Sequence, residues 1–220
     1  MVFMADSERA AGLALEHNIS AGLHLNFTTQ FNSHLATARL AEHQQRVASY
    51  LRRHRFAQAL FNPLLTDSFE YVLKAQNDEF ARLYGEQPSR VDGHHHMHLC
   101  SNVLIAGLLA PGTIVRRHFS FQPGEKSLLN RLYRKSVDYI LAKRHLLADL
   151  FFSLPPLDPL SRLQTIFSLG REHNVEVEAH PANPQEHRFL TEGGVFRCVS
   201  GVPIAHGYCL QPIKHGLLVR

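Results

Sequence analysis

Short apolar runs alternate with longer stretches of helical periodicity along this chain, the pattern of βα units. Residues 19–27 are expected to form a strand, because apolar residues alternate there with polar ones and His24 falls on the polar face. Short strands are also predicted at residues 90–93 and 113–117, and residues 175–180 show the most regular alternation. Strands of this kind, separated by helices, pair in parallel.

The stretches between these strands have the spacing of amphipathic helices. Helices are expected over residues 6–17, 34–61, 65–84, 99–109, 124–150 and 160–173. The chain beyond Pro181 has no clear periodicity and is predicted to be loop-like. With 220 residues, the whole chain (1–220) is expected to form a single α/β domain, either a parallel sheet or an irregular β/α barrel.

Composition narrows the class of protein. The apolar fraction of 45% and charged fraction of 19% are those of an ordinary globular protein. The net charge of +4 is scattered, which argues against nucleic-acid binding. No apolar run reaches the roughly 18 residues of a membrane span, and the N-terminus lacks the pattern of a signal peptide. Three cysteines without a CxxC pair indicate a reducing, cytoplasmic setting.

Histidine is unusually frequent, with 16 in the chain, and three predicted strands end in one. These are His24, the run that begins at His94, and His180. Functional sites of parallel α/β folds lie beyond the carboxyl ends of the strands. The three histidines are therefore predicted to converge on one pocket.

The segment VDGHHHMH at residues 91–98 is the strongest candidate for a metal site. If it stays extended, its polar face carries Asp92, His94, His96 and His98. Imidazole is the commonest metal ligand near neutral pH, and a nearby carboxylate can orient it through its second nitrogen. Solvated histidines at a polar strand end would give the same pattern, and His24 alone would also fit a half-buried structural residue.

The segment VEVEAHP at residues 175–181 places Glu176, Glu178 and His180 on one side of a strand. A carboxylate beside a histidine favours the protonated imidazolium, which suits a general acid that donates a proton to a leaving amine. A solvent-facing edge strand is the alternative explanation.

Three segments, in order and with similar spacing, resemble the YdjC-like family of ChbG- and HpnK-type carbohydrate deacetylases. They are GLHLNFT at residues 22–28, VDGHHHMH at residues 91–98 and VEVEAHP at residues 175–181. The resemblance covers about residues 3–188. It implies an incomplete parallel β/α barrel of the polysaccharide-deacetylase-like type.

The resemblance also implies an activity and a set of site residues. The activity is metal-dependent hydrolysis of N-acetyl groups of amino sugars or related carbohydrates, with Mg²⁺ or Zn²⁺ as the ion. His24 and His94 would be metal ligands, and His180 would be the catalytic acid near the leaving group. Asp92 would orient a ligand, and Arg116 would lie near the acidic groups.

Three points qualify the resemblance. Arg117 could match the family's arginine instead of Arg116, and Gly93 stands where the family usually has serine. The family's first strand ends in a pair of aspartates, a metal ligand and the general base, in the motif A-D-D-F-G. No such motif occurs here, since Asp6 stands at a helix start. We therefore expect that the first strand is missing and that these residues alone have negligible activity.

Two other interpretations remain open. Amidohydrolases and PHP-type phosphoesterases also place H-x-H at the end of a strand, although usually on their first strand. A chain that binds metal weakly without turnover is the second alternative, because the aspartate pair is absent. The expected partner is an N-acetylated carbohydrate, with no nucleic acid and no membrane span, and a homodimer is compatible with the sequence.

Overall fold

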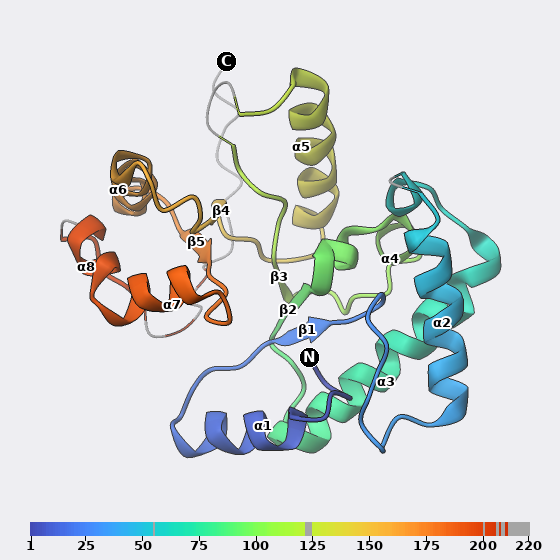
Figure 1. Cartoon of the computed structure of the whole chain (residues 1–220). Helices are drawn as coiled ribbons and strands as arrows, with labels where there is room; N and C mark the ends of the chain where they lie inside the picture. The colour runs from blue at the N-terminus through green and yellow to red at the C-terminus, as the bar shows by residue number, and fades with distance from the viewer. Residues whose placement is uncertain (55, 122–124, 200, 206, 208–209, 211–220) are drawn as a thin grey trace. The chain divides into compact units, whose positions relative to one another are not determined.

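The computed structural model describes the chain except residues 55, 122–124, 200, 206, 208–209 and 211–220. The described residues fall into two compact units (Figure 1). Met1–Arg116 and Lys143–His145 belong to the first, and Arg117–Ala142 and Leu146–Arg220 to the second. The single domain over residues 1–220 stays a prediction.

The first unit is built on a small parallel sheet with the strand order β1-β2-β3. The strands are β1 (Leu23–Leu25), β2 (Arg90–Gly93) and β3 (Ile114–Val115). Leu23 pairs with Val91, which in turn pairs with Val115. These three side chains are buried, so one side of the sheet contributes to the core.

Helices and short 3₁₀ turns surround this sheet. They are α1 (Ser7–Glu16), α2 (Ala38–Arg52), η1 (Ala57–Ala59), η2 (Pro63–Leu65), α3 (Thr66–Tyr84), η3 (His94–Leu99) and α4 (Ser101–Ile105). The longest, α3, contacts both α1 and α2 (Figure 1). It buries Phe69, whose ring lies 5.3 Å from that of Phe27 just after β1. It ends at Gly85, whose φ of 76° is the left-handed conformation that glycine adopts at helix ends.

A buried side chain of α3 also holds the backbone that follows β1. Gln76 Oε1 accepts a hydrogen bond from the Asn26 backbone N–H at 2.7 Å, and its Nε2 donates to the Asn26 carbonyl at 3.2 Å. Both residues are fully buried. Gln76 thus satisfies two backbone groups that have no water to bind, and it fixes the direction in which the chain leaves β1.

His98 makes the corresponding connection after β2. Its Nε2 lies 2.9 Å from the Arg116 carbonyl, which can only accept, so this nitrogen carries the proton. The ring is fully buried, and Nδ1 has no hydrogen-bond partner in the described part of the chain. Burial lowers the pKa of His98 to about 4. His98 is therefore a neutral residue that joins the end of β2 to the end of β3.

The second unit contains a two-stranded parallel sheet of β4 (Leu150–Ser153) and β5 (Val175–Glu178). Its helices are α5 (Leu128–Ala142), α6 (Leu160–Ser168), η4 (Leu169–Arg171), α7 (Pro184–Thr191) and α8 (Gly194–Val199). Leu154, Leu163, Phe189 and Cys198 form its buried core. Leu154 directly follows β4 and the other three come from α6, α7 and α8, so helices cover the sheet as in a βα unit.

Parallel pairing and a mixed α/β class are confirmed, but the pairing strands form two small sheets. Completion of a barrel stays a prediction. The strand predicted at residues 19–27 is shorter than expected, because only Leu23–Leu25 pairs with a neighbour. The predicted helices at residues 34–61 and 99–109 are also shorter, and they are represented by α2 and α4.

Two sequence predictions are wrong in the second unit. The helix expected over residues 124–150 ends at Ala142, and Leu150 begins β4, which the sequence analysis missed. Residues 184–199 are not loop-like, because they form α7 and α8, whereas residues 200, 206, 208–209 and 211–220 lie outside the described part of the chain. Asn183 caps α7 by accepting from the Gln185 backbone N–H at 2.9 Å, and Pro184 stands at the first helical position.

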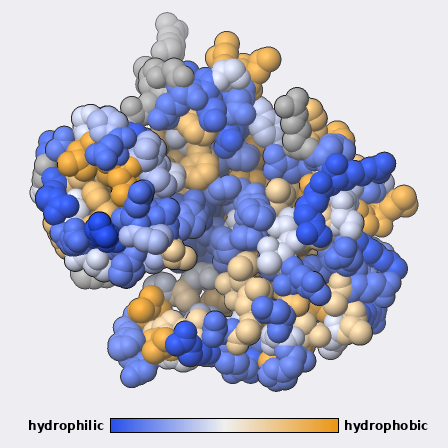
Figure 2. Space-filling model, in the orientation of Figure 1, coloured by the Kyte–Doolittle hydropathy of each residue, from blue (hydrophilic) through white to orange (hydrophobic). Residues whose placement is uncertain are grey.

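The surface of the second unit carries apolar side chains on α5. Leu128, Leu129, Leu132 and Ile140 are each at least half exposed, and Figure 2 shows hydrophobic residues at the surface over this helix. Among the described helices, none has both the length and the apolar character needed to cross a membrane.

The two hydrogen bonds from Gln76 to the Asn26 backbone predict a large loss of stability when Gln76 is substituted. Gln76→Leu leaves the Asn26 N–H and carbonyl buried without partners, and we expect the free energy of unfolding to fall by about 3 kcal/mol. Urea denaturation measures this change. Gln45→Leu is the matched control, since Gln45 is exposed on α2 and bonds only Ser49 among the described contacts. Equal stability of the two variants would contradict this role of the Gln76 hydrogen bonds.

The buried neutral His98 predicts a pH dependence. Its pKa falls from 6.5 to about 4 on folding, so the unfolded chain binds the extra proton first as the pH drops. The contribution of His98 to the free energy of unfolding is complete above pH 6.5. It is lost as the pH falls towards 4, by roughly 3 kcal/mol in total. His98→Gln keeps a donor for the Arg116 carbonyl but cannot titrate. Denaturation at several pH values should show a shallower acid loss for this variant, and parallel profiles would contradict the prediction.

Candidate active site

The carboxyl ends of the three strands in the first unit bring together residues that are far apart in the sequence. His24 on β1 is the register partner of Asp92 on β2. Arg116 follows β3 directly, and its backbone N–H donates to the Val91 carbonyl at 3.0 Å. Because the strands are parallel, these three side chains emerge at one edge of the sheet.

Asp92 is the centre of this group. Its Oδ1 accepts a hydrogen bond from His24 Nδ1 at 2.9 Å, and its Oδ2 lies 2.5 Å from Arg116 Nη1. Burial raises the pKa of Asp92, but the His24 hydrogen bond and the positive charge of Arg116 outweigh it and hold the pKa at about 2. The carboxylate is thus ionised at any physiological pH.

His24 and His94 lie next to each other with edge-to-face rings, whose centroids are 5.8 Å apart. A carboxylate only accepts hydrogen bonds, so the proton of the neutral His24 ring is on Nδ1 and its Nε2 presents a lone pair. Burial lowers the pKa of His94, and the neighbouring His95 and His24 lower it further. The neutral imidazole that results is the form that binds a metal ion.

The histidine run does not stay extended, so the prediction of a shared face for Asp92, His94, His96 and His98 is wrong. Residues 94–99 turn into η3, and His95 and His96 have φ values of 54° and 57°, in the left-handed region. His98 turns inward as a result. Gly93 permits this turn, because a Cβ there would lie 2.9 Å from the His98 backbone nitrogen.

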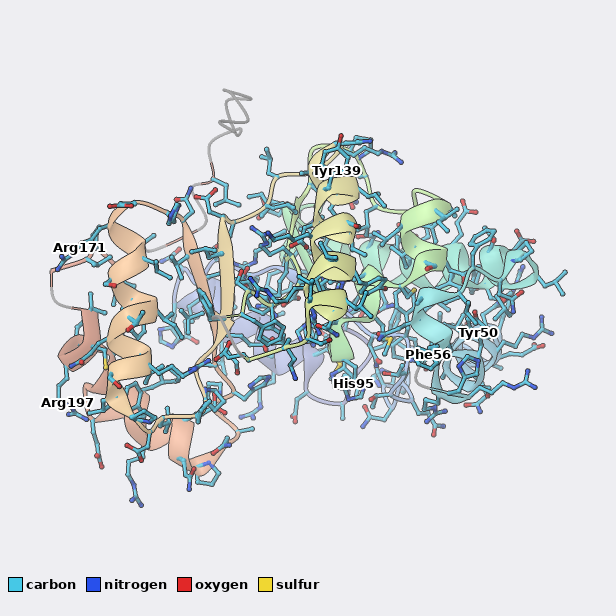
Figure 3. The ribbon with its side chains drawn as sticks, turned by 90° about the horizontal axis from the view of Figure 1, so that it is seen from above. Tyr50, Phe56, His95, Tyr139, Arg171 and Arg197 are labelled. Atoms are coloured by element: carbon cyan, nitrogen blue, oxygen red, sulfur yellow. The ribbon has the colours of Figure 1, made fainter. Side chains whose placement is uncertain are left out.

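His95 is held by a residue of the β1 exit. Its Nδ1 lies 3.0 Å from the hydroxyl of Thr28, which is buried. Its ring lies against that of His94, with centroids 3.9 Å apart, and the residue itself is exposed (Figure 3). The exposed ring therefore lies beside that of His94, which is partly exposed.

The donor set fits a divalent ion only in part. His24 and His94 offer two neighbouring imidazoles, and Asp92 orients the first of them. Within the described residues, however, no three histidine, cysteine, aspartate or glutamate side chains are grouped so that they could hold a metal ion. Asp92 itself is occupied by His24 and Arg116. Asp6 stands at the N-terminus of α1, with its carboxylate 3.7 Å from Arg9.

His180 belongs to the second unit, on the segment that follows β5. Its backbone N–H donates to Oε2 of buried Glu186 at 2.7 Å, and its Nδ1 lies 3.8 Å from the same oxygen. Its Nε2 lies 4.0 Å from Oε2 of Glu178, and the ring is more than half exposed. Two carboxylates therefore flank this imidazole. The sequence predicted that of Glu178 but not that of Glu186. Its convergence with His24 and His94 stays a prediction.

The two candidate arginines have different partners. Arg116 contacts Asp92, whereas Arg117 Nη2 lies 2.7 Å from Asp138 on α5 and its Nη1 donates to the carbonyls of Ala148 and Asp149. Arg116 is therefore the arginine near the acidic group of the first unit, and Arg117 stabilises the second unit.

The pair formed by Thr28 and His95 was not predicted from the sequence. Thr28 is part of the quoted segment at residues 22–28, but 67 positions separate it from His95. The periodicity of each strand gave no register between them. The one available signal was that two histidine-bearing strands in parallel would bring residues 22–28 close to residues 91–98.

The comparison with known proteins identifies the family of the chain. No curated protein matches the sequence. The family model described as "YdjC-like protein" matches residues 1–194, which include His24, Asp92, His94 and His180. This favours the carbohydrate deacetylases over the amidohydrolase and PHP-type alternatives. The chain therefore belongs to the YdjC-like family, which is in general a family of carbohydrate deacetylases.

Proposed function

We propose that this chain carries the centre of a metal-dependent deacetylase that hydrolyses N-acetyl groups of amino sugars or related carbohydrates. The observation that carries the proposal is the adjacent pair His24 and His94, with His24 oriented by Asp92 at the carboxyl edge of the sheet. Membership of a carbohydrate deacetylase family supports the choice of substrate class.

In this proposal His24 Nε2 and the His94 ring bind a divalent ion, Mg²⁺ or Zn²⁺. Two imidazoles beside a carboxylate suit Zn²⁺, and a site rich in water would suit Mg²⁺. A bound ion would polarise the acetyl carbonyl and lower the pKa of a water molecule. One further carboxylate would complete the ligands and a second would take the proton from water, because no third ligand lies with the two histidines in the described residues.

The chain's own residues have separate roles in this scheme. Asp92 fixes the tautomer and orientation of His24, and Arg116 neutralises the charge of Asp92. His180 donates the proton to the departing amine, since it is exposed and lies between the carboxylates of Glu178 and Glu186. The products are a free amino sugar and acetate.

A second candidate is a chain that binds a metal ion without turnover. The absence of a three-residue ligand group among the described residues favours it for these 220 residues taken alone. The two candidates share the histidine pair and differ in whether acetate is released.

The histidine pair predicts a specific loss of metal binding. His24→Ala or His94→Ala removes one of two nitrogen ligands, and we expect the affinity for Zn²⁺ to fall at least about 100-fold. Asp92→Asn should weaken binding about tenfold, because it removes the charge that supports His24. Calorimetry with Zn²⁺ and with Mg²⁺ measures each change. His34→Ala is the control, since His34 is exposed in the loop before α2. If it weakened binding as much as His24→Ala, the ions would be binding surface histidines.

Acetate release separates the two candidates. The chain alone is expected to release negligible acetate from N-acetylglucosamine oligomers. An N-terminal extension with a strand and paired aspartates should produce release that a chelator abolishes, since proton transfer by a general base is worth about 10²–10⁴-fold. In the extended chain, His180→Ala should reduce turnover by a similar factor and leave metal affinity unchanged.

The control for His180 is His187→Ala, because His187 is exposed on α7 in the same unit. It should retain full turnover. An extended chain that binds metal but never releases acetate would support the second candidate, and acetate release that persists in chelator would refute metal dependence. Loss of metal affinity in His180→Ala would make this residue a ligand instead.

A further inference from the structure

The two consecutive left-handed residues at the start of η3 call for a physical explanation. His95 and His96 have φ values of 54° and 57°, and neither is a glycine. This conformation is unfavourable for residues with a Cβ, and side chains kept in it are concentrated at functional sites. The turn directs the His95 ring outward, where the residue is exposed, while His98 turns into the core.

The His95 ring is exposed but fixed. Thr28 is buried, which leaves its side chain little room to move, and its backbone N–H donates to the Asn26 side chain at 3.2 Å. That hydroxyl lies 3.0 Å from His95 Nδ1. Asn26 is in turn held by Gln76 from α3. A chain of buried groups thus holds one nitrogen of an exposed ring, and Nε2 has no hydrogen bond with any of the described residues.

The ring is also placed at the candidate active site. It lies at 33° to the His94 ring with centroids 3.9 Å apart, and it belongs to η3, directly after β2. His94 is itself partly exposed, so the two rings lie within reach of one ligand. A rigid polar side chain in such a position binds a ligand with little loss of conformational entropy.

We infer that His95 is a substrate-binding residue that hydrogen-bonds an N-acetylated amino sugar through Nε2 and positions its acetamido group over His94. The choice of sugar rests on the proposed function. The contact itself rests on the fixed ring, its exposure and its contact with His94. A sugar offers hydroxyl and amide groups that can donate to or accept from an imidazole nitrogen in either tautomer.

The test uses the full chain and measures binding, so it does not depend on turnover. The probes are tri-N-acetylchitotriose and its fully deacetylated counterpart, with calorimetry or ligand-observed NMR in the presence and absence of Zn²⁺. His95→Gly removes the ring and relieves the backbone, because glycine adopts a positive φ without strain. We expect it to weaken binding of the acetylated sugar about tenfold, the value of one good hydrogen bond. Its melting temperature should be equal to or above that of the wild type.

His96→Gly is the matched control, since it relieves the same backbone conformation and keeps the His95 ring. It should bind the sugar as the wild type does. Thr28→Val removes the hydroxyl that fixes the ring at nearly constant volume, and it should weaken binding about threefold. His95→Asn, which tolerates the left-handed conformation, provides a second variant should His95→Gly fold poorly.

The outcomes separate this inference from the proposed function. Sugar binding that falls in His95→Gly and not in His96→Gly supports the inference, even if the metal or acetate experiments fail. Wild-type affinity in His95→Gly and His95→Asn overturns it, and so does a wild-type chain that binds neither sugar. A lower melting temperature in both His95 variants, with sugar affinity unchanged, would assign His95 a purely structural role.

Discussion

The contacts of Asp92 organise the carboxyl ends of the strands in the first sheet. This carboxylate lies on the central strand and contacts His24 from β1 on one side and Arg116 after β3 on the other. Burying a charge costs free energy unless an opposite charge and hydrogen bonds compensate it. If one partner is lost, the charge that remains is buried without compensation. The three side chains therefore stabilise their common arrangement only together, which makes the orientation of His24 depend on Arg116.

Short strands could not hold this arrangement by their own pairing. β1 has three residues and β3 has two, so few ladder hydrogen bonds fix the points at which the chain leaves the sheet. Buried side chains supply what the ladders lack. Gln76 binds both backbone groups of Asn26 after β1, and His98 binds the Arg116 carbonyl after β3. Both contacts act within a few residues of the candidate site, which explains why uncharged, fully buried polar residues are found there.

The sequence was informative where one local rule decides the structure. Alternation predicted β2 and β5, and helical periodicity predicted α3 almost to the residue. It failed at β4, because Phe151 and Phe152 are both buried and a continuous apolar run has no period. It also failed at α7, although the Asn183 cap is a helix-start signal that the sequence contains.

The sequence predicted part of the candidate site as well. Motif resemblance located His24, Asp92 and His94, which the sheet brings together. It could not choose between Arg116 and Arg117, because neighbouring residues leave a strand in opposite directions and only tertiary contacts show which one meets Asp92.

The electrostatics of Asp92 also decide what it can do. A general base works best when its pKa is near the working pH, and the His24 hydrogen bond and Arg116 hold that of Asp92 at about 2. Such a carboxylate is a weak proton acceptor, and both of its oxygens already have partners. The same contacts make it effective at holding His24 in one tautomer, with Nε2 directed away from the carboxylate. Asp92 is therefore suited to orienting His24, and in the proposed reaction the proton of the attacking water would go to a different group.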